Sequence, residues 1–260
     1  MDDGGTAAMS SDVWALVGEP RFGGILVVSD HASNHVPEDI DLAIDPALLT
    51  EHIAVDIGVK QVGTLLAQNP GIAFFHARFS RLVCDVNRDE HAPGLVPIAS
   101  DGHVIPGNDL DHAGREKRIE RFYRPYHAAL AELLDRAPPA LILSLHSFTP
   151  RLAAHSDQAR PWQVGVLYNE DHRAARLAIP LLEVGGLIVG DQEPYSGKLL
   201  NHTMNRHAEA EGRPYLGVEI RQDEIADAAG QARWAERLAP IANAVALEVG
   251  EQSPQRDPSC

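Results

Sequence analysis

Short apolar runs alternate with longer segments of helical periodicity along most of this sequence, and this alternation limits the folds available to the chain. Seven runs have the length of a buried strand: residues 24–29, 72–77, 82–86, 140–146, 164–169, 187–191 and 215–220. Segments with helical spacing of apolar residues separate several of them: residues 46–68, 114–137, 171–184, 198–211 and 222–249. Strands that alternate with helices predict an α/β fold with three layers, in which a mostly parallel sheet is covered by helices on both faces.

The length and apolar content predict one large domain that spans residues 1–260. A chain of 260 residues with 44% hydrophobic residues can bury a sizeable core, and no repeat or linker divides it. Residues 1–20 and 251–260 are rich in Gly, Ser, Asp and Pro, so we expect them to be peripheral tails. The polar segment 89–113 has the length of a functional or disordered loop, and a lid is one such function.

The charge of the chain argues against nucleic acids and anionic membranes as partners. The formal net charge is −15 and no long run of Lys and Arg occurs, so the attraction to phosphate that dominates nucleic-acid binding is missing. A small anionic substrate would therefore need a local group of arginines. The sequence has neither a signal-peptide pattern nor a run of roughly 20 apolar residues that could cross a bilayer. Its two cysteines, Cys84 and Cys260, form no disulfide framework, and we expect a cytoplasmic protein.

Polar side chains gather where several of the expected strands end. Ligands of open α/β sheets bind beyond the carboxyl ends of the strands, so these positions carry the candidate site. Histidines stand at the ends of the first and fourth runs, an acidic residue lies near the end of the seventh, and two arginines and an asparagine surround the third: His31, His146, Glu219, Arg81, Arg88 and Asn87.

Metal chemistry accounts for this mixture of residue types. Catalytic zinc takes three protein ligands, mostly imidazole nitrogens and carboxylate oxygens, and leaves a fourth position for water. His31 and His146 are the candidate nitrogen ligands. Asp56 is the preferred third ligand, and His52, one turn earlier on the same face of the expected helix, is a possible ligand or supporting partner. Glu219 is then the candidate base that takes a proton from the reacting water.

The remaining polar residues suit an acidic substrate, and each has a structural alternative. Arg81 and Arg88, with Asn87, offer donors matched to a carboxylate. A single histidine at a strand end is nevertheless more often a hydrogen-bonded structural group than a ligand. Asp56 could equally be a solvated carboxylate, and Glu219 could pair across a sheet edge. The prediction depends on the whole set rather than on any one member.

Several motifs together resemble the N-formylglutamate amidohydrolase family. They are, in order, SDHASNHVPED, HIAVDIG, ARFSRLVCDVNRDE, FYRPYHAAL, LSLHSFTP, PYSGK and GVEIRQDEI, and they cover most of residues 24–225. The resemblance implies a fold similar to the zinc-dependent exopeptidases, with a mixed, largely parallel sheet. It is specific for the family and less so for the substrate, since family membership does not fix the molecule that is cleaved.

The order of residues is also similar to that of the zinc carboxypeptidases. By that similarity, His31 and His146 are metal ligands, Arg81 and the Asn87–Arg88 pair bind the substrate carboxylate, Tyr195 is a catalytic tyrosine and Glu219 is the catalytic glutamate. One position departs from the pattern, because Asn34 stands three residues after His31 where those enzymes have a glutamate ligand. Either the acidic ligand comes from elsewhere, with Asp56 as our candidate, or the metal is held differently.

These observations predict a metal-dependent hydrolase that cleaves an N-formyl or other N-acyl acidic amino acid such as N-formylglutamate, with zinc as cofactor. The alternatives are an N-acyl amino-acid or carboxypeptidase-like hydrolase and a non-catalytic protein that binds small carboxylates. A serine hydrolase is disfavoured, because Ser147 lacks the Gly-x-Ser-x-Gly turn that exposes such a nucleophile.

Overall fold

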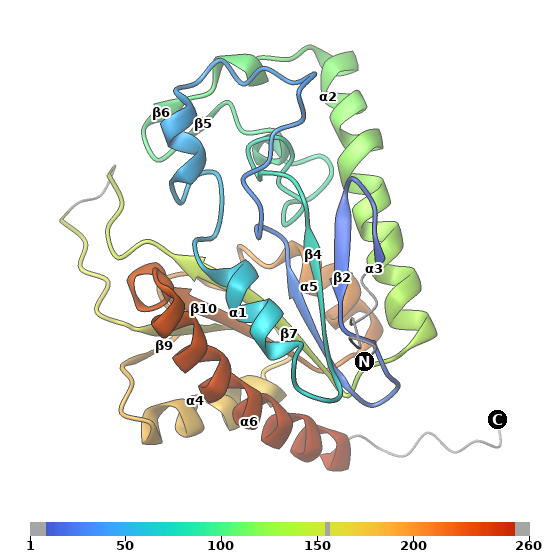
Figure 1. The fold of residues 1–260 in the computed structure, drawn as a ribbon, viewed down its shortest axis with the longest axis vertical. Helices are drawn as coiled ribbons and strands as arrows, with labels where there is room; N and C mark the ends of the chain where they lie inside the picture. Colours follow the sequence, from blue (N-terminus) through green and yellow to red (C-terminus); the bar gives the residue numbers. More distant parts are fainter. Residues whose placement is uncertain (1–8, 154–156, 253–260) are drawn as a thin grey trace, which may run out of the picture.

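A mixed sheet of eight strands forms the centre of the molecule (Figure 1). The computed structural model describes residues 9–153 and 157–252. The strands lie in the order β1-β2-β4-β3-β7-β10-β8-β9. Their bounds are β1 Met9–Ser10, β2 Trp14–Val17, β3 Ile25–Ser29, β4 Ile72–Ala77, β7 Leu141–Phe148, β8 Val164–Leu167, β9 Val189–Asp191 and β10 Tyr215–Arg221. A hairpin of β5 (Ala99–Ser100) and β6 (His103–Val104) forms a separate small sheet.

The four central strands, β4, β3, β7 and β10, are parallel to one another. Antiparallel pairs occur towards the edges, where β2 pairs with β4 and β8 pairs with β10. Because parallel strands end on the same side, the segments that follow β3 and β4 and the last residues of β7 and β10 share one edge of the sheet. The predicted α/β class with a mixed, mostly parallel sheet is therefore confirmed.

Helices cover both faces of this sheet, as predicted. On one face lie α1 (Val59–Leu66), α4 (Arg173–Val184) and α6 (Ala228–Gln252), and on the other lie α3 (Arg124–Arg136) and α5 (His202–His207). A short helix α2 (His112–Arg118) and a π-helical turn, η4 (Ile119–Tyr123), lead directly into α3. Figure 1 shows these elements as one long green helical rod beside the sheet.

The residues of strand β3 pack into the apolar clusters on both faces of the sheet. All five of its residues are buried. Ile25 and Val27 belong to the apolar cluster with α1 and α6, whereas Leu26 and Val28 belong to the cluster with α3. Successive side chains of a strand point to opposite faces, so a strand covered on both faces must be apolar at every position. The uninterrupted apolar run ILVV, residues 25–28, therefore suits β3 to the centre of the sheet.

Three predicted segments differ from the structure. The apolar run 82–86 is buried but forms turns, because the N–H groups of Leu82, Val83 and Cys84 bond to Ser80 rather than to a neighbouring strand. The expected helix 46–68 is split into a 3-10 turn, η1 (Pro46–Thr50), and the shorter α1. In the expected tail 1–20, residues 9–17 add β1 and β2 to the sheet.

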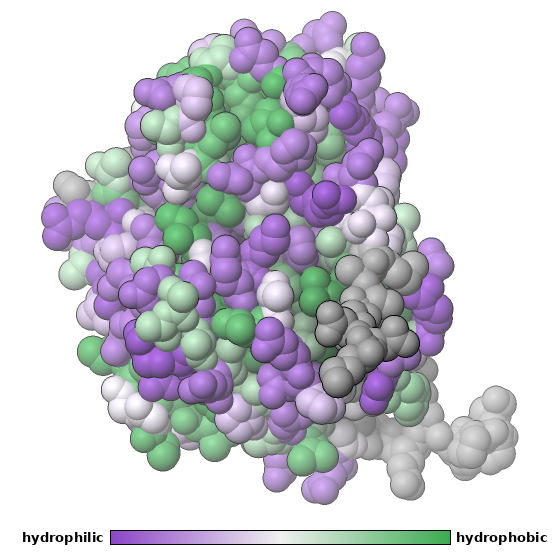
Figure 2. All heavy atoms as spheres, in the orientation of Figure 1, coloured by the Kyte–Doolittle hydropathy of each residue, from purple (hydrophilic) through white to green (hydrophobic). Residues whose placement is uncertain are grey.

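The other predicted elements are confirmed within a few residues, with 198–211 reduced to α5 and a 3-10 turn over Glu209–Glu211. At the other expected tail, residues 251–252 complete α6, and residues 253–260 lie outside the described residues. Figure 2 shows hydrophilic residues over most of one face, with apolar residues in several small groups. Within the described residues, no helix is long and apolar enough to span a membrane.

Candidate active site

His31 and Asp56, far apart in the sequence, are joined through their backbones at the edge of the sheet. The N–H of Asp56 donates to the carbonyl of His31 at 2.9 Å. The prediction that Asp56 lies on the first helix is wrong. Asp56 lies in the turn before α1. Gly58 ends this turn with a φ of 83°, and a Cβ there would lie 2.3 Å from the carbonyl oxygen of Ile225, so only glycine fits. The turn places the Asp56 carboxylate beside His31.

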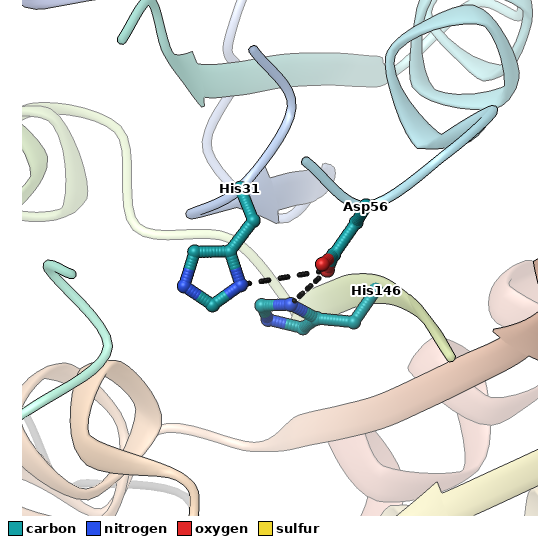
Figure 3. Close-up of side chains that lie close together, drawn as sticks. All are labelled: His31, Asp56 and His146. Carbon is teal, nitrogen blue, oxygen red and sulfur yellow. Dashed lines mark hydrogen bonds and ion pairs between the residues drawn. The ribbon is translucent and has the colours of Figure 1, made fainter. Parts of the chain in front are cut away.

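His146, near the end of β7, faces the same carboxylate. Its Nδ1 lies 2.9 Å from Oδ2 of Asp56, while Nδ1 of His31 lies 3.5 Å from that oxygen. Figure 3 shows the two imidazole rings and the carboxylate turned toward one another. One ligand atom from each of the three buried residues lies within 4.8 Å of the other two. The structure thus brings together all three predicted metal ligands.

A further carboxylate stands behind each histidine. Nε2 of His31 lies 2.7 Å from Oδ1 of Asp85, and Nε2 of His146 lies 3.6 Å from Oδ2 of Asp30. The hydroxyl of Tyr126 donates to the other oxygen of Asp30 at 2.7 Å. A carboxylate behind Nε2 keeps the proton on that nitrogen, which leaves the lone pair on Nδ1. Both rings can therefore present Nδ1 as a ligand.

Charge pairing dominates the electrostatics of this cluster. Burial opposes every charge in it, but the neighbouring imidazoles hold the pKa of Asp56 below its ordinary value. The pKa of His146 is raised well above its ordinary value, although burial lowers it, because Asp30 and Asp56 stabilise the protonated ring. The pKa of Asp85 is likewise held well below its usual range, against the effect of burial, by Arg81 and His31. An anionic carboxylate between two rings is the environment that a cation requires.

The donor set fits a divalent metal. Nδ1 of His31 is buried and makes no hydrogen bond to any residue that the structure describes, although Oδ2 of Asp56 lies at 3.5 Å. A buried polar atom without a hydrogen bond is costly unless something else satisfies it. Two imidazole nitrogens and one carboxylate oxygen are a ligand set that catalytic zinc sites use.

Glu219 lies on β10 directly opposite His146 on β7. It lines the same pocket as the three ligands. Burial and the nearby charge of Asp56 raise its pKa to about 7, against the opposing effects of His146, His31 and Arg81. A carboxyl group with a pKa near 7 can both accept and return a proton at neutral pH.

The three predicted substrate-binding residues also line this pocket, but their contacts differ. Arg81 donates to Asp85 at 2.9 Å and to Asp56 at 3.4 Å, so its guanidinium is bound within the cluster. Oδ1 of Asn87 accepts from the N–H of Thr203 at 3.0 Å, and its NH₂ group makes no hydrogen bond to any residue within 9–153 and 157–252. Arg88 is the most open of the three, with 35% of its side chain exposed and one contact of 3.5 Å to Asp85.

Tyr195 lines the pocket and contacts an arginine that sequence reasoning missed. Nη1 of Arg160 donates to the tyrosine oxygen at 3.0 Å, and its guanidinium lies 5.0 Å from the centre of the tyrosine ring. Because the oxygen accepts this bond, the hydroxyl proton stays free to donate. Burial and the charge of Glu219 raise the pKa of Tyr195, so the hydroxyl keeps its proton at neutral pH.

His52 lines the pocket but does not join the metal ligands. The predicted helical spacing to Asp56 is wrong, because both residues lie in the turn before α1. Nε2 of His52 instead lies 3.0 Å from Asp101, at the tip of the β5–β6 hairpin. Asp101 also accepts from the N–H of Ala153 at 2.9 Å. The segment 89–113 therefore reaches the rim of the pocket through Asp101.

Comparisons with known proteins agree with this geometry. A family model described as N-formylglutamate amidohydrolase matches residues 23–226. The chain belongs to the N-formylglutamate amidohydrolase family. This is a family of amide-hydrolysing enzymes, and the match includes every predicted site residue. The comparison with curated proteins found no match.

Two crystal structures are similar to this member of the N-formylglutamate amidohydrolase family over nearly its whole length. A gene product of Agrobacterium tumefaciens is 29% identical, with a TM-score of 0.85, over 92% of this chain and 96% of that one. An N-formylglutamate amidohydrolase from Ralstonia eutropha is 23% identical, with a TM-score of 0.69, over 94% and 100%. At 23% identity, the similarity to the Ralstonia eutropha structure shows a shared fold and no more than that.

Sequence reasoning assigned no role to three residues that contact the candidate site of this amidohydrolase, namely Asp30, Asp85 and Arg160. Asp30 precedes His31 at the end of the first run, and that position was a usable signal. Asp85 was hidden within an apolar run that reads as a strand, so its side chain would have been assigned to a sheet face. Arg160 lies in a loop whose sequence carries no indication of its contact with Tyr195.

Proposed function

We propose that this protein is a metal-dependent amidohydrolase that removes an N-formyl group, or another small N-acyl group, from an acidic amino acid such as N-formylglutamate. The observation that carries the proposal is the buried cluster of His31, Asp56 and His146, with Glu219 beside it in one pocket. A candidate cation site, a carboxyl group with a pKa near 7 and a partly exposed guanidinium together suit hydrolysis of a small anionic amide.

We propose zinc as the metal, held by Nδ1 of His31, Nδ1 of His146 and the carboxylate of Asp56. When bound, zinc polarises an amide carbonyl and lowers the pKa of a water molecule so that it attacks at neutral pH. Asp85 and Asp30 hold the two rings in the orientation that this ligation requires.

Glu219 acts as the proton carrier in this proposal. It accepts a proton from the attacking water and returns it to the nitrogen of the departing amino acid. The pKa of about 7 suits both halves of the transfer, because the group is then neither fully ionised nor fully protonated at neutral pH. Tyr195, whose oxygen already accepts a bond from Arg160, has its proton free to donate to the oxygen that gains negative charge.

Arg88 and Asn87 bind the substrate carboxylate in this proposal. Arg88 offers its partly exposed guanidinium and Asn87 its NH₂ group, and bonds from such donors fix the position of a carboxylate. Arg81, predicted as part of the same clamp, is bound to Asp56 and Asp85, so we assign it mainly to holding the charges of the cluster. The clamp orients the scissile amide towards the metal ligands.

The test is a hydrolysis assay with N-formyl, N-acetyl and peptidyl glutamate, using protein stripped of metal and then reloaded with zinc. We expect zinc-dependent release of glutamate from the formyl substrate, and loss of that activity in His146→Ala. Zinc-independent hydrolysis, or a His146→Ala variant as active as the wild type, would refute the metal-dependent mechanism. Faster turnover of the acetyl or peptidyl substrate would instead move the substrate to that class.

The role of Arg88 has a matched control in the substrate. Arg88→Met should raise KM for the acidic substrate on the order of 10- to 100-fold, because a charge-assisted bond contributes about 1.5–3 kcal/mol. The corresponding carboxamide substrate should bind the wild type and Arg88→Met equally weakly. An unchanged KM for the acidic substrate in Arg88→Met would place the carboxylate elsewhere in the pocket.

A further inference from the structure

A second pair of buried histidines lies outside the pocket, between α3 and α5. His127 of α3 is 1% exposed and His207 of α5 is 4% exposed. Nδ1 of His127 lies 2.9 Å from Nε2 of His207, and the two rings stack with their centres 5.1 Å apart. The other nitrogen of His127, Nε2, lies 3.0 Å from the carbonyl oxygen of Val86. None of the roles assigned above uses this pair.

The contacts of the pair fix the proton on each ring. A carbonyl oxygen can only accept, so Nε2 of His127 carries a proton and donates it to Val86. Burial and the neighbouring ring lower the pKa of His127 to about 3, so the ring is neutral and its Nδ1 is an acceptor. His207 must then donate from Nε2. The result is a directed chain of two hydrogen bonds, from His207 to His127 and from His127 to Val86.

Val86 lies inside the segment that carries three polar groups of the site. Asp85, which bonds to His31, precedes it, and the proposed carboxylate donors Asn87 and Arg88 follow it. Asp85 has further anchors of its own, because its backbone N–H donates to Leu95 and its side chain accepts from Arg81. The backbone N–H groups of Asn87 and Arg88 bond back to Asp85 at 3.1 and 3.0 Å. The carbonyl of Val86 is the point at which α3 and α5 hold this second half of the segment.

Helix α5, which carries His207, also contacts this second half of the segment through Thr203. The hydroxyl of Thr203 approaches the carbonyl of Val86 at 3.4 Å, and its N–H donates to Oδ1 of Asn87 at 3.0 Å. Thr203 and His207 are four residues apart on α5, one helical turn. The helix therefore contacts the clamp segment twice, once directly through Thr203 and once through the two histidines.

We propose that His127 and His207 are positioning residues that hold segment 85–88 so that Asn87 and Arg88 point to the substrate carboxylate. This inference rests on the proposed function, because it assigns the pair to the clamp of that site. Neither ring touches the pocket, and both act through the carbonyl of Val86. A metal-binding role does not suit the pair, since the described residues place no third ligand with them.

The chain of hydrogen bonds can be tested without any substrate. Long-range ¹⁵N–¹H spectra at pH 7 should show Nε2 protonated and Nδ1 unprotonated on both His127 and His207. In His207→Phe the amide of Thr203 should exchange on the order of tenfold faster, because Asn87 loses its fixed position. A doubly protonated His127, or unchanged exchange at Thr203 in His207→Phe, would overturn the inference.

Kinetics separate positioning from simple packing. His207→Phe should raise KM for the acidic substrate about tenfold and change kcat about threefold at most, with zinc content unchanged. His207→Gln should restore most of the wild-type KM, because its NH₂ group can donate to Nδ1 of His127 from a similar place. A KM in His207→Phe equal to that of the wild type, or a His207→Gln variant as impaired as His207→Phe, would contradict the proposal.

His76→Phe is the matched control for removing a buried imidazole. His76 is 4% exposed on β4 and bonds to the carbonyl of Ala77, away from segment 85–88. It should leave KM and the exchange of Thr203 unchanged. If the wild type hydrolyses no acyl amino acid, the proposed function fails, whereas the spectra and the exchange rates still decide whether the histidine pair holds segment 85–88.

Discussion

Two pairs of buried histidines contact segment 85–88, one at Asp85 through His31 and one at Val86 through His127, and their partners differ. The centres of the His31 and His146 rings lie 5.2 Å apart, and those of His127 and His207 lie 5.1 Å apart. In the first pair the rings face a shared carboxylate oxygen of Asp56. In the second pair one ring bonds directly to the other, and the pair ends on a backbone carbonyl.

The partners decide the charge of each pair. Carboxylates stand behind and between His31 and His146, and they raise the pKa of both rings in spite of burial. The second pair has no carboxylate in direct contact among the described residues, so burial lowers the pKa of His127 to about 3 and that of His207 to about 4. Similar burial and similar spacing thus accompany a candidate cation site in one place and a neutral, hydrogen-bonded pair in the other.

Removing the shared carboxylate should break the first pair most strongly. Asp56→Asn leaves a side chain of the same shape without charge, so we expect loss of bound zinc and a fall in kcat of at least about 10³-fold. Zinc content and kcat, measured on the same preparation, check this. A variant that keeps stoichiometric zinc would show that Asp56 is not a ligand.

Ser147→Ala is the matched control for Asp56→Asn. Ser147 follows His146 and lines the same pocket, but its hydroxyl donates to the carbonyl of Ile57. We expect zinc content and kcat within about twofold of the wild type, since the hydroxyl bonds to the carbonyl of Ile57 and not to the three candidate ligands, and one neutral hydrogen bond contributes little. A large loss of kcat with full zinc content would revive a role for this serine.

Glu219→Gln should remove the proton carrier and leave the first pair intact. The amide has the shape of the carboxyl group but cannot accept the proton, so kcat should fall on the order of 10²-fold while zinc stays bound. The pH dependence of kcat/KM in the wild type should show a limb near pH 7 that the variant lacks. A variant with wild-type kcat would assign proton transfer to another group.

Much of the fold could be predicted, because the apolar runs report burial directly. The run at 24–29 is apolar on both faces of its strand, and only a central strand needs that. The run at 82–86 is equally buried but is not a strand, because Ser80 supplies the local hydrogen bonds that a neighbouring strand would supply. Apolar periodicity records which residues are buried and not where their backbone groups bond.

The candidate ligands could be named from the sequence, whereas the residues that contact them from behind could not. His31, His146 and Glu219 follow from the rule that parallel strands end on one edge, and the structure brings them into one pocket with Asp56. Asp85 and the His127–His207 pair could not be predicted, because their roles depend on contacts between segments far apart in the sequence. Nothing in the local pattern of FYRPYHAAL indicates that its histidine holds Val86.

The two histidine pairs also differ in the carboxylates behind them. Asp85 and Asp30 lie behind the candidate metal ligands His31 and His146, whereas no carboxylate among the described residues contacts the second pair directly. Asp85→Asn and Asp30→Asn should each weaken zinc binding about 10- to 100-fold, because each candidate ligand ring loses the anionic partner of its Nε2. Competition with a chelator measures the zinc Kd. Asp101→Asn is the control, because this carboxylate contacts His52 at the rim and should leave the Kd unchanged. An unchanged Kd in Asp85→Asn would show that orientation of His31 does not depend on it.

The second pair should make its own contribution to the pH dependence of stability. Its pKa values lie below the ordinary value of about 6.5, so between pH 6 and 5 the unfolded chain binds more protons than the folded protein. Stability from these two residues is therefore present above about pH 6.5 and falls with decreasing pH, by about 1 kcal/mol per pH unit for each histidine. The double variant His127→Phe/His207→Phe should lack this slope, whatever its stability at pH 7. Urea unfolding of both proteins at pH 6.0, 5.5 and 5.0 gives the difference, and parallel pH profiles would mean that the two histidines are not held neutral by the fold.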